Sequence, residues 1–423
     1  MRLSSCSKVD SVDIQPKANS LKTFNDPIYG FISIQDSLIF KLIEHPYFQR
    51  LRRISQLGLT NLVYGGANHS RFQHALGAMN LMRSAINVLR AKGIEITPEE
   101  EQASKAAILL HDIGHGPFSH ALENTIVRGI DHERIGLTIM KELNDEFNGE
   151  LNLAISIFSG QHPKKFLHQL VSSQLDTDRL DYLKRDSFFT GVSEGVIGSE
   201  RIIKMLAVHD GELAVEAKGL YSLEKFLIAR RLMYWQVYLH KTVVSAEFLL
   251  MQILIRAKEQ FRDGVDLWAS GSLRYFLEGK NLEASDTSWL SHFLKLDDYD
   301  IFSSIKQWIK SDDKVLGELC ERLINRKLLK VKLLEHPLDQ AVIDELREEV
   351  AKELNWSKEE ASYLLFQNSL SNTAYNPESE RITVLYKDGS VQDISNAASI
   401  FRFSSLEAQE TKNYLYYPTF LNV

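Results

Sequence analysis

The chain has 423 residues, of which 44% are hydrophobic, so it can bury a large core and carry an appendage beside its main domain. Its net charge of −7 argues against general nucleic-acid binding, and the absence of a run of about eighteen apolar residues argues against a membrane span. It holds only two cysteines, Cys6 and Cys320, and no apolar secretory segment at its N-terminus, so we expect a cytoplasmic protein.

The N-terminal part combines turn residues with apolar residues at alternating or helical spacing. This pattern predicts a loose tail, then a turn with a short strand, then two helices. These elements are expected at residues 1–20, 25–34, 36–43 and 48–58. Arg50, Arg52 and Arg53 lie along the second helix, and such a cluster is typical of a solvated helix face.

The central feature is the stretch 111–120, His-Asp-Ile-Gly-His-Gly-Pro-Phe-Ser-His. The helix before it starts at a capping box of Thr97 and Glu100, and its apolar stripe leads directly to His111. Adjacent His111 and Asp112 offer one nitrogen and one oxygen ligand to a metal such as Mn, Fe, Zn or Ni. An isolated His-Asp pair is more often a polar helix end. Further His and Asp residues that can converge here favour a metal site.

Two other predicted helices carry polar residues on otherwise apolar segments. Ser70 opens the first with Gln73 as a capping box, and His74 lies near its start beside Arg71. A histidine on an apolar face is usually a satisfied core residue, but this position favours a ligand role. In the second helix Asp178 shares a polar face with nearby residues, and the aspartate spacing does not fit an EF-hand calcium loop.

The rest of the chain alternates predicted helices with two hairpins marked by Asp-Gly turns. We expect helices at 132–143, 151–171 with a break at 160–163, and 223–261, hairpins at 207–215 and 381–394, and a last strand at 414–417. Aromatic and basic side chains on the helix at 223–261 can stack on a base or bind phosphate, although such residues more often form a helix edge.

Together these segments resemble the HD-domain phosphohydrolases, and within them the deoxynucleoside triphosphate triphosphohydrolases. The resemblance spans roughly residues 22–260. Its motifs are Asn25-Asp26-Pro27, Gln49-Arg50-Leu51-Arg52, Gln56-Leu57-Gly58, Arg71-Phe72-x-His74, the stretch 111–120, and Asp178-x-x-Asp181-Tyr182. Several separate segments in the family's order are far more specific than a lone His-Asp pair.

The resemblance implies roles for individual residues. The metal ligands would be His74, His111, Asp112 and Asp178, holding a divalent ion such as Mn, Fe, Zn, Ni or Mg. His115, His120 and His132 would surround the attacked phosphate, with Glu123 as the carboxylate that pairs with His120. Phosphate contacts would come from Arg71, Arg179 and Lys241, and sugar contacts from Gln56, Tyr182, Asp186 and Tyr238. An activating nucleotide would bind near Lys22, Asn25, Gln49 and Arg52.

We therefore expect a mainly α fold, with an HD-domain helical core, a few β-hairpins and a mixed α+β C-terminal region. The expected division is a tail at 1–20, a catalytic core at 21–262 and a C-terminal region at 263–423. The expected activity is metal-dependent hydrolysis of deoxynucleoside triphosphates to deoxynucleoside and triphosphate, in a homo-oligomer with no membrane partner. The alternatives are an HD hydrolase of another nucleotide phosphoester, or a non-catalytic nucleotide-sensing scaffold.

Overall fold

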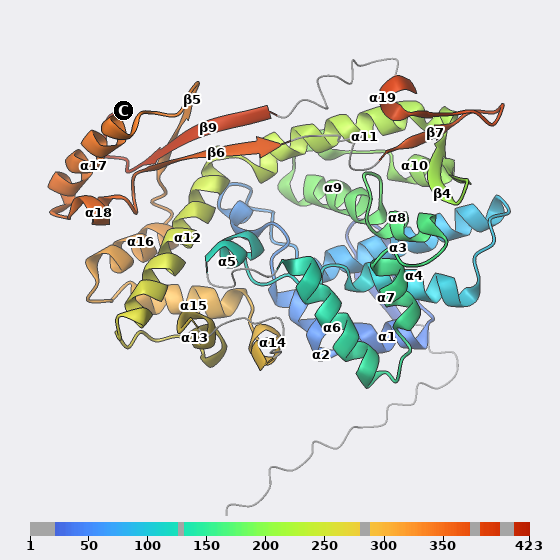
Figure 1. Ribbon diagram of the computed structural model, residues 1–423, viewed down its shortest axis with the longest axis horizontal. Coiled ribbons are helices and arrows are strands. Elements are labelled where there is room, and N and C mark those ends of the chain that lie inside the picture. Colours follow the sequence, from blue (N-terminus) through green and yellow to red (C-terminus); the bar gives the residue numbers. More distant parts are fainter. Residues whose placement is uncertain (1–21, 126–130, 280–287, 373–380, 398–409) are drawn as a thin grey trace, which may run out of the picture.

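The computed structural model describes residues 22–125, 131–279, 288–372, 381–397 and 410–423. Its fold is mainly helical with small sheets, which confirms the expected fold class (Figure 1). The predicted loose tail at 1–20 lies outside the described residues. The division of the chain near residue 262 stays a prediction.

The N-terminal part begins with a β-hairpin and continues through helices that surround α3 and α4 (Figure 1). These elements are β1 (Lys22–Asp26), β2 (Gly30–Ile34), α1 (Ser37–Glu44), α2 (Pro46–Gln49), α3 (Arg71–Ala91), α4 (Pro98–Leu110), α5 (Ser119–Thr125), α6 (His132–Glu146), α7 (Asn152–Phe158), α8 (Lys165–Val171), α9 (Thr177–Thr190) and α10 (Ser199–Met205), with 3-10 turns η1 (Arg50–Arg53), η2 (Gly58–Leu62) and η3 (Ser193–Gly195). Both predicted capping boxes, at Ser70 and at Thr97, are present.

The next part joins these helices to the C-terminal region through a long helix, α12 (Lys241–Arg262), which contacts α5 of the N-terminal part and α16 of the C-terminal part. The elements before α12 are β3 (Leu206–His209), β4 (Glu212–Glu216), η4 (Ala217–Gly219), α11 (Leu220–Met233) and the π-helical turn η5 (Tyr234–Tyr238). Those after it are α13 (Gly271–Leu277), α14 (Ser288–Phe293), α15 (Asp298–Trp308), α16 (Lys314–Ile324), β5 (Lys330–Leu334), α17 (Gln340–Leu354), α18 (Lys358–Ala361), β6 (Phe366–Asn372), β7 (Thr383–Leu385), β8 (Val391–Asp393), α19 (Ile394–Ala397) and β9 (Glu410–Tyr417).

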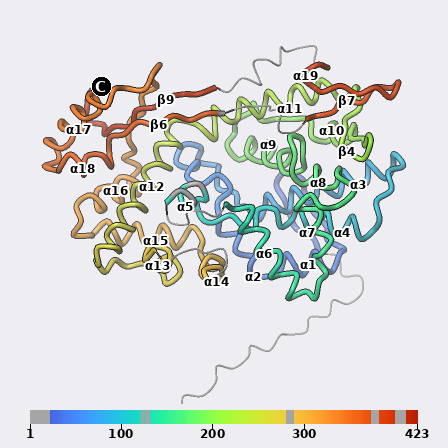
Figure 2. Tube along the Cα trace, in the orientation of Figure 1, coloured from blue at the N-terminus to red at the C-terminus, as the bar shows by residue number. Residues whose placement is uncertain are grey.

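The sheets tie the C-terminal chain back to earlier elements. Strands run in the order β3-β4-β7-β8, with β7 parallel to β4, and a second sheet has the order β5-β9-β6. Figure 2 shows the red end of the chain returning to both places. At the predicted Asp-Gly turn, Asp210 and Gly211 have φ of +51° and +80°, the left-handed values that a two-residue hairpin turn requires. Both predicted hairpins and the last strand are confirmed.

Two helix predictions were wrong in part. The helix expected at 48–58 is a short α2 followed by the 3-10 turn η1, and Ser55 then forms an isolated bridge with Ser70. Arg50 lies on this segment with its side chain fully buried, so it does not belong to a solvated face. The helix expected over 223–261 is interrupted by η5 and by His240, whose extended backbone caps α12.

Buried apolar side chains form one continuous cluster from Ile32 to Leu421. It includes the inner faces of α3, α4 and α12, so the polar groups described next stand on elements held by extensive packing. Among the described residues no single helix is long and apolar enough to cross a membrane, and only residues 217–238 and 241–262, bent by 55°, pass as a pair.

Candidate metal centre

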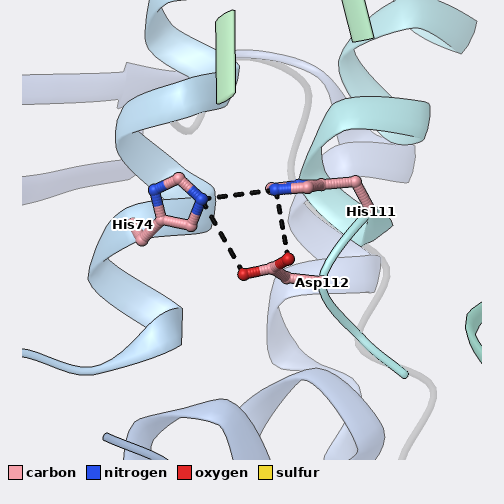
Figure 3. A group of neighbouring side chains, drawn as sticks. All are labelled: His74, His111 and Asp112. Atoms are coloured by element: carbon pink, nitrogen blue, oxygen red, sulfur yellow. Dashed lines mark hydrogen bonds and ion pairs between the residues drawn. The ribbon is translucent and has the colours of Figure 1, made fainter. Parts of the chain in front are cut away.

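Three side chains from two helices meet at the N-terminal part's centre. His74 lies in the first turn of α3, while His111 caps the C-terminus of α4 and Asp112 follows it. Figure 3 shows the two imidazoles and the carboxylate turned toward one another. His74 Nε2 is 3.3 Å from His111 Nε2 and 3.8 Å from Asp112 Oδ2, and His111 Nε2 is 3.3 Å from Asp112 Oδ1. Metal–ligand bonds of about 2.0–2.2 Å place neighbouring ligand atoms roughly 3–4 Å apart.

The fourth predicted ligand, Asp178 on α9, reaches the same point. Its Oδ1 is 3.0 Å from His74 Nε2 and 3.5 Å from His111 Nε2. Asp176 caps α9 by accepting from the Arg179 backbone N–H, which fixes where the first turn of the helix starts. The structure therefore brings all four predicted ligand residues together.

The hydrogen bonds of the two histidines leave their lone pairs facing this point. His74 Nδ1 donates to Asp181 Oδ2 at 2.8 Å, and His111 Nδ1 donates to the Ile108 carbonyl at 2.6 Å. In the neutral rings both Nε2 atoms are then unprotonated, and they face each other and two carboxylates. Four groups whose lone pairs face one another repel unless a cation lies between them, so these residues fit a divalent metal.

The pKa shifts of His74 and Asp178 also favour a cation at this point. Burial lowers the pKa of His74, but hydrogen bonds to Asp178 and Asp181 outweigh it and raise the pKa to about 10. Burial also opposes ionisation of Asp178, yet the two imidazoles hold its pKa well below the usual range. The carboxylates thus favour a positive charge between them, which a metal supplies.

A buried chain of ion pairs stands behind His74. Asp181 accepts from Arg185 Nε at 2.8 Å and Nη2 at 3.0 Å, and Arg185 Nη1 donates to Asp26 Oδ2 at 2.8 Å. Asp26 in turn accepts the backbone N–H groups of Ile28 and Tyr29, which forms the turn between β1 and β2. This chain fixes the tautomer and the orientation of the His74 ring.

The proteins similar to this chain share the sequence segments that build the centre. Residues 71–186 match the HD domain, and residues 197–262 match the HD associated region. An uncharacterized protein of Bacillus subtilis, YwfO, is 32% identical over 421 residues, covering 95% of this chain and 93% of that protein. This chain belongs to the HD-domain phosphohydrolase family.

A solved structure and a named relative extend this assignment. The crystal structure of a phosphohydrolase from Bacteroides thetaiotaomicron has a TM-score of 0.91 and 49% identity, over 94% of this chain and all of that one. The deoxynucleoside triphosphate triphosphohydrolase SAMHD1 homolog of Dictyostelium discoideum is 31% identical over 57% of this chain and 50% of its own length. The cofactor of this HD-domain phosphohydrolase is a divalent metal.

Two predicted histidines form a stacked pair beside the metal centre of the phosphohydrolase. The rings of His115 and His132 are 4.0 Å apart at 17°, and His115 Nε2 lies 3.3 Å from Asp112 Oδ1. Ser119 Oγ donates to the Gly116 carbonyl, so it accepts from His115 Nδ1 at 2.8 Å. Burial and then the charge of Arg71 lower the pKa of His115 to about 3, which keeps this ring neutral.

Arg50 holds the backbone of the loop that carries His115. Its Nη2 donates to the carbonyls of Ile113 at 2.9 Å and His115 at 3.0 Å, and its Nη1 donates to the Leu296 carbonyl at 3.2 Å. The guanidinium also lies 5.1 Å from the Phe293 ring centroid. A buried charge is retained only with such partners, and here they include the C-terminal region.

Two cavities reach the ion pair between Arg71 Nη1 and Asp112 Oδ2, which are 2.6 Å apart, because Arg71 lines the first and Asp112 lines the second. The first, of about 250 Å³, is lined by Ser55, Gln56, Leu57, Gly58, Thr60, Arg71, Phe118, Ser119, Ala121, Tyr234, Tyr238, Leu239 and Glu247. The second, of about 570 Å³, contains the metal ligands His111, Asp112 and Asp178 with His115, His132, Arg134, His168 and Arg179 among its other lining residues. We name them the Gln56 cavity and the metal cavity.

The predicted substrate-binding residues are divided between the two cavities and their surroundings. Gln56, Arg71 and Tyr238 line the Gln56 cavity, and Gln56 Oε1 is buried without a hydrogen-bond partner. Arg179 lines the metal cavity, where its guanidinium pairs with Asp176. Tyr182 packs edge-on against Tyr238.

Three of the predicted contacts, Tyr182, Asp186 and Lys241, do not line either cavity. Asp186 is buried and accepts from His69 Nε2 and from the Tyr238 hydroxyl, both at 2.8 Å, so it supports the cavity wall from behind. Lys241 is exposed at the start of α12 and is absent from the linings of both cavities. The side chains of His120 and Glu123, on α5, lie outside the described part of the structure.

The four residues predicted near an activating nucleotide lie around β1 and α2. Lys22, Asn25 and Arg52 are exposed. The Arg52 guanidinium stacks 3.5 Å from the Phe72 ring centroid, and its Nε donates to Gln49 Oε1 at 2.8 Å. Lys22 Nζ lies 5.3 Å from the Phe40 ring centroid. None of the four lines either cavity.

Sequence reasoning missed the residues that support the site from behind. Asp26 and Asp181 stand inside the family motifs with no predicted role, Arg185 carries no prediction, and Arg50 is predicted on a solvated face, whereas all four are buried. One signal was available, because a carboxylate three residues after a ligand aspartate lies about one turn along the same helix face.

Proposed function

We propose that this HD-domain phosphohydrolase hydrolyses deoxynucleoside triphosphates to deoxynucleoside and inorganic triphosphate. The observation that carries the proposal is the Arg71–Asp112 ion pair, whose arginine lines the Gln56 cavity and whose aspartate lines the metal cavity with His111 and Asp178. The Gln56 cavity offers aromatic side chains and an unpartnered amide, as a nucleoside requires, while the metal cavity offers His132, Arg134, His168 and Arg179 to phosphates. A relative of the same family bears the name of a deoxynucleoside triphosphate triphosphohydrolase.

In this reading the α-phosphate lies at the metal ligands, the nucleoside in the Gln56 cavity and the outer phosphates in the metal cavity. A bound divalent metal supplies charge neutralisation and a lowered pKa for a coordinated water. Arg71 lies at the junction, where its charge meets the α-phosphate while Asp112 holds its guanidinium in place. The ion pair thus orients the arginine before substrate arrives.

Bond cleavage needs two proton movements. Water attacks the α-phosphorus and loses a proton, and the 5′-oxygen of the sugar leaves and gains one, so the products are a nucleoside and triphosphate. We assign the acid–base role to His115, His120 and His132 together, with His120 closest to the attack, because an ordinary imidazole exchanges protons near neutral pH. The lowered pKa of His115 keeps that ring neutral, so its part is to accept a proton rather than to donate one. The stacking of His132 on His115 fixes two of these rings relative to each other.

The test is hydrolysis of each deoxynucleoside triphosphate in oxygen-18 water by the metal-loaded protein, with products separated by chromatography. We expect label in inorganic triphosphate and none in the nucleoside. A labelled nucleoside monophosphate would overturn the triphosphohydrolase activity in favour of another phosphoester hydrolase. Failure of all nucleotides, cyclic and linear, in the presence of each divalent metal would favour a non-catalytic scaffold.

A matched pair of variants links the turnover to the site. Asp112→Ala removes a predicted ligand and should abolish both turnover and metal retention. Loss of a residue that only supports a ligand already lowers metal affinity or activity by about 10–100-fold, and loss of a ligand should cost more. Asp145→Ala, at an exposed residue of α6, should leave both unchanged. If Asp112→Ala keeps metal and full activity, the assignment of the site is wrong.

We also propose that an activating nucleotide binds the surface of Lys22, Asn25, Gln49 and Arg52, and that the protein acts as a homo-oligomer. Support for the first part is the exposure of Lys22 and Arg52, two cations beside aromatic rings, which suits a phosphate and a base.

A further inference from the structure

Glu247 is a carboxylate inside the Gln56 cavity that the proposed mechanism does not use. It lies on α12, one turn and a half after the helix begins, and lines the cavity with Phe118 and Gly58. A Cβ placed on Gly58 would lie 3.6 Å from Glu247 Oε1 and 3.8 Å from the Phe118 ring, so the carboxylate lies against the cavity wall. It therefore faces whatever occupies the cavity.

No side chain in the described part of the chain pairs with this carboxylate. Among the described residues, no hydrogen bond or ion pair involves Glu247, and burial raises its pKa to about 7. Removing a carboxylate from water without a partner costs stability. A group of this kind in a ligand cavity is typical of a residue that receives its partner from the ligand.

The charges of the cavity decide which end of a nucleotide reaches Glu247. Arg71 stands where the cavity meets the metal ligands, and its cation attracts the α-phosphate. A carboxylate repels phosphate, so the end that faces Glu247 has to be the uncharged one. In a nucleotide that end is the base.

We propose that Glu247 selects the base of the substrate by accepting a hydrogen bond from an exocyclic amino group. This inference rests on the proposed function, and it names the substrate class within it. An ionised carboxylate only accepts hydrogen bonds. The N4 amino group of cytosine and the N6 amino group of adenine donate them, whereas thymine and uracil present the O4 oxygen at the matching position.

The test compares substrates that differ only at this group. dCTP carries an amino group where dUTP carries a carbonyl, and dATP and dITP differ in the same way. At pH 8, above the pKa of Glu247, we expect kcat/KM of the metal-loaded enzyme to favour dCTP over dUTP and dATP over dITP by about 10–100-fold, the range of one good base contact.

Two variants separate the role of Glu247 from a general effect on α12. Glu247→Gln keeps the shape of the side chain but can donate as well as accept, so both ratios should fall to within about threefold of unity. Glu259→Gln removes a carboxylate from the same helix that pairs with Arg256 and does not line the cavity, and it should keep the wild-type ratios. Equal rates in the wild type, or ratios unchanged in Glu247→Gln, would overturn the inference.

Failure of the proposed function gives a different result. If no deoxynucleoside triphosphate is hydrolysed, dissociation constants for dCTP and dUTP measured by calorimetry in EDTA decide about Glu247. Binding of dCTP about tenfold tighter than dUTP, lost in Glu247→Gln, would support base selection at a site with another chemistry. Equal dissociation constants, or no binding of either nucleotide, would overturn it.

Discussion

Gly77 on α3 and Asp181 on α9 approach so closely that a Cβ on Gly77 would lie 2.1 Å from Asp181 Oδ1. The same Cβ would lie 2.2 Å from Arg185 Nη2. The absent side chain is what allows the Asp181 carboxylate to reach His74 Nδ1, one turn before Gly77 on the same helix. The two helices can therefore support the metal centre only while position 77 is glycine.

The first prediction is that Gly77→Ala separates α3 from α9. Overpacking of this kind costs about 1–3 kcal/mol of stability, and displacement of Asp181 should weaken metal binding by about 10–100-fold. Denaturant unfolding and metal analysis after dialysis measure the two effects. Gly271→Ala is the control, because a Cβ there meets no atom within 4 Å. Native metal content and stability in Gly77→Ala would contradict the expected crowding.

The second prediction concerns removal of the metal. Because the lone pairs of His74, His111 and two aspartates face one point, the metal should bind the folded chain in preference to the unfolded one. At metal concentrations of about 100–1,000 times the dissociation constant, binding adds roughly 3–4 kcal/mol to the free energy of unfolding. EDTA should lower the unfolding midpoint of the wild type and leave Asp112→Ala unaffected. Identical unfolding curves with and without EDTA would count against the centre.

The third prediction is a pH dependence of stability set by Asp298. Its Oδ2 accepts from the Ser55 backbone N–H at 2.9 Å and from Ser55 Oγ at 2.6 Å, and burial raises its pKa to about 6. The unfolded carboxyl has a pKa of about 3.9, so the folded state binds more protons between these values. The contribution of the Asp298 carboxyl to the free energy of unfolding is therefore fully present below about pH 4, and it is lost as the pH rises through 6.

Asp298→Asn removes this titration. The free energy of unfolding of the variant minus that of the wild type should increase by on the order of 2–3 kcal/mol from pH 4 to pH 7. Urea unfolding at each pH measures this difference. Asp312→Asn, at an exposed residue, should track the wild type across the range. A constant difference between Asp298→Asn and the wild type would show that the carboxyl does not titrate differently on folding.

The fourth prediction tests the proposed activating nucleotide. Mixtures of deoxynucleoside triphosphates should be hydrolysed faster than the sum of the single rates, since coupling between sites is typically about 1–3 kcal/mol. Arg52→Ala should remove this excess without changing the rates in single nucleotides that do not activate. Lys387→Ala, in the turn between β7 and β8, serves as the charge-matched control. Strictly additive rates in every pairwise mixture would remove the support for this site.

Features that depend on residues close together in the chain could be predicted from the sequence. The capping boxes at Ser70 and Thr97 and the Asp-Gly turns are local, and each was predicted at the right residue. The HD family membership was predicted as well, because its motifs are short. The interruption of the helix after Met233 was missed, since nothing in the residue types of Tyr234–Tyr238 forbids an α-helix.

The supporting groups could not be predicted because their partners are remote in the chain. Arg50 resembles its exposed neighbours Arg52 and Arg53 in every local respect, and only remote contacts, with the loop of His115 and with Leu296, bury it. Asp181 and Asp26 meet through Arg185, which lies 159 residues after Asp26. Charged residues are almost never fully buried unless paired, so a surface location was the reasonable expectation for each of them.

The Arg50 contacts have a consequence for how this enzyme can be cut or recombined. A fragment ending at residue 262 would keep His74, His111, Asp112 and Asp178, and would therefore contain every predicted metal ligand. It would lose the Leu296 carbonyl and the Phe293 ring, leaving one end of a buried guanidinium without its partners beneath the loop of His115. Exchange of the C-terminal region between relatives is therefore constrained by an arginine that lies in the N-terminal part.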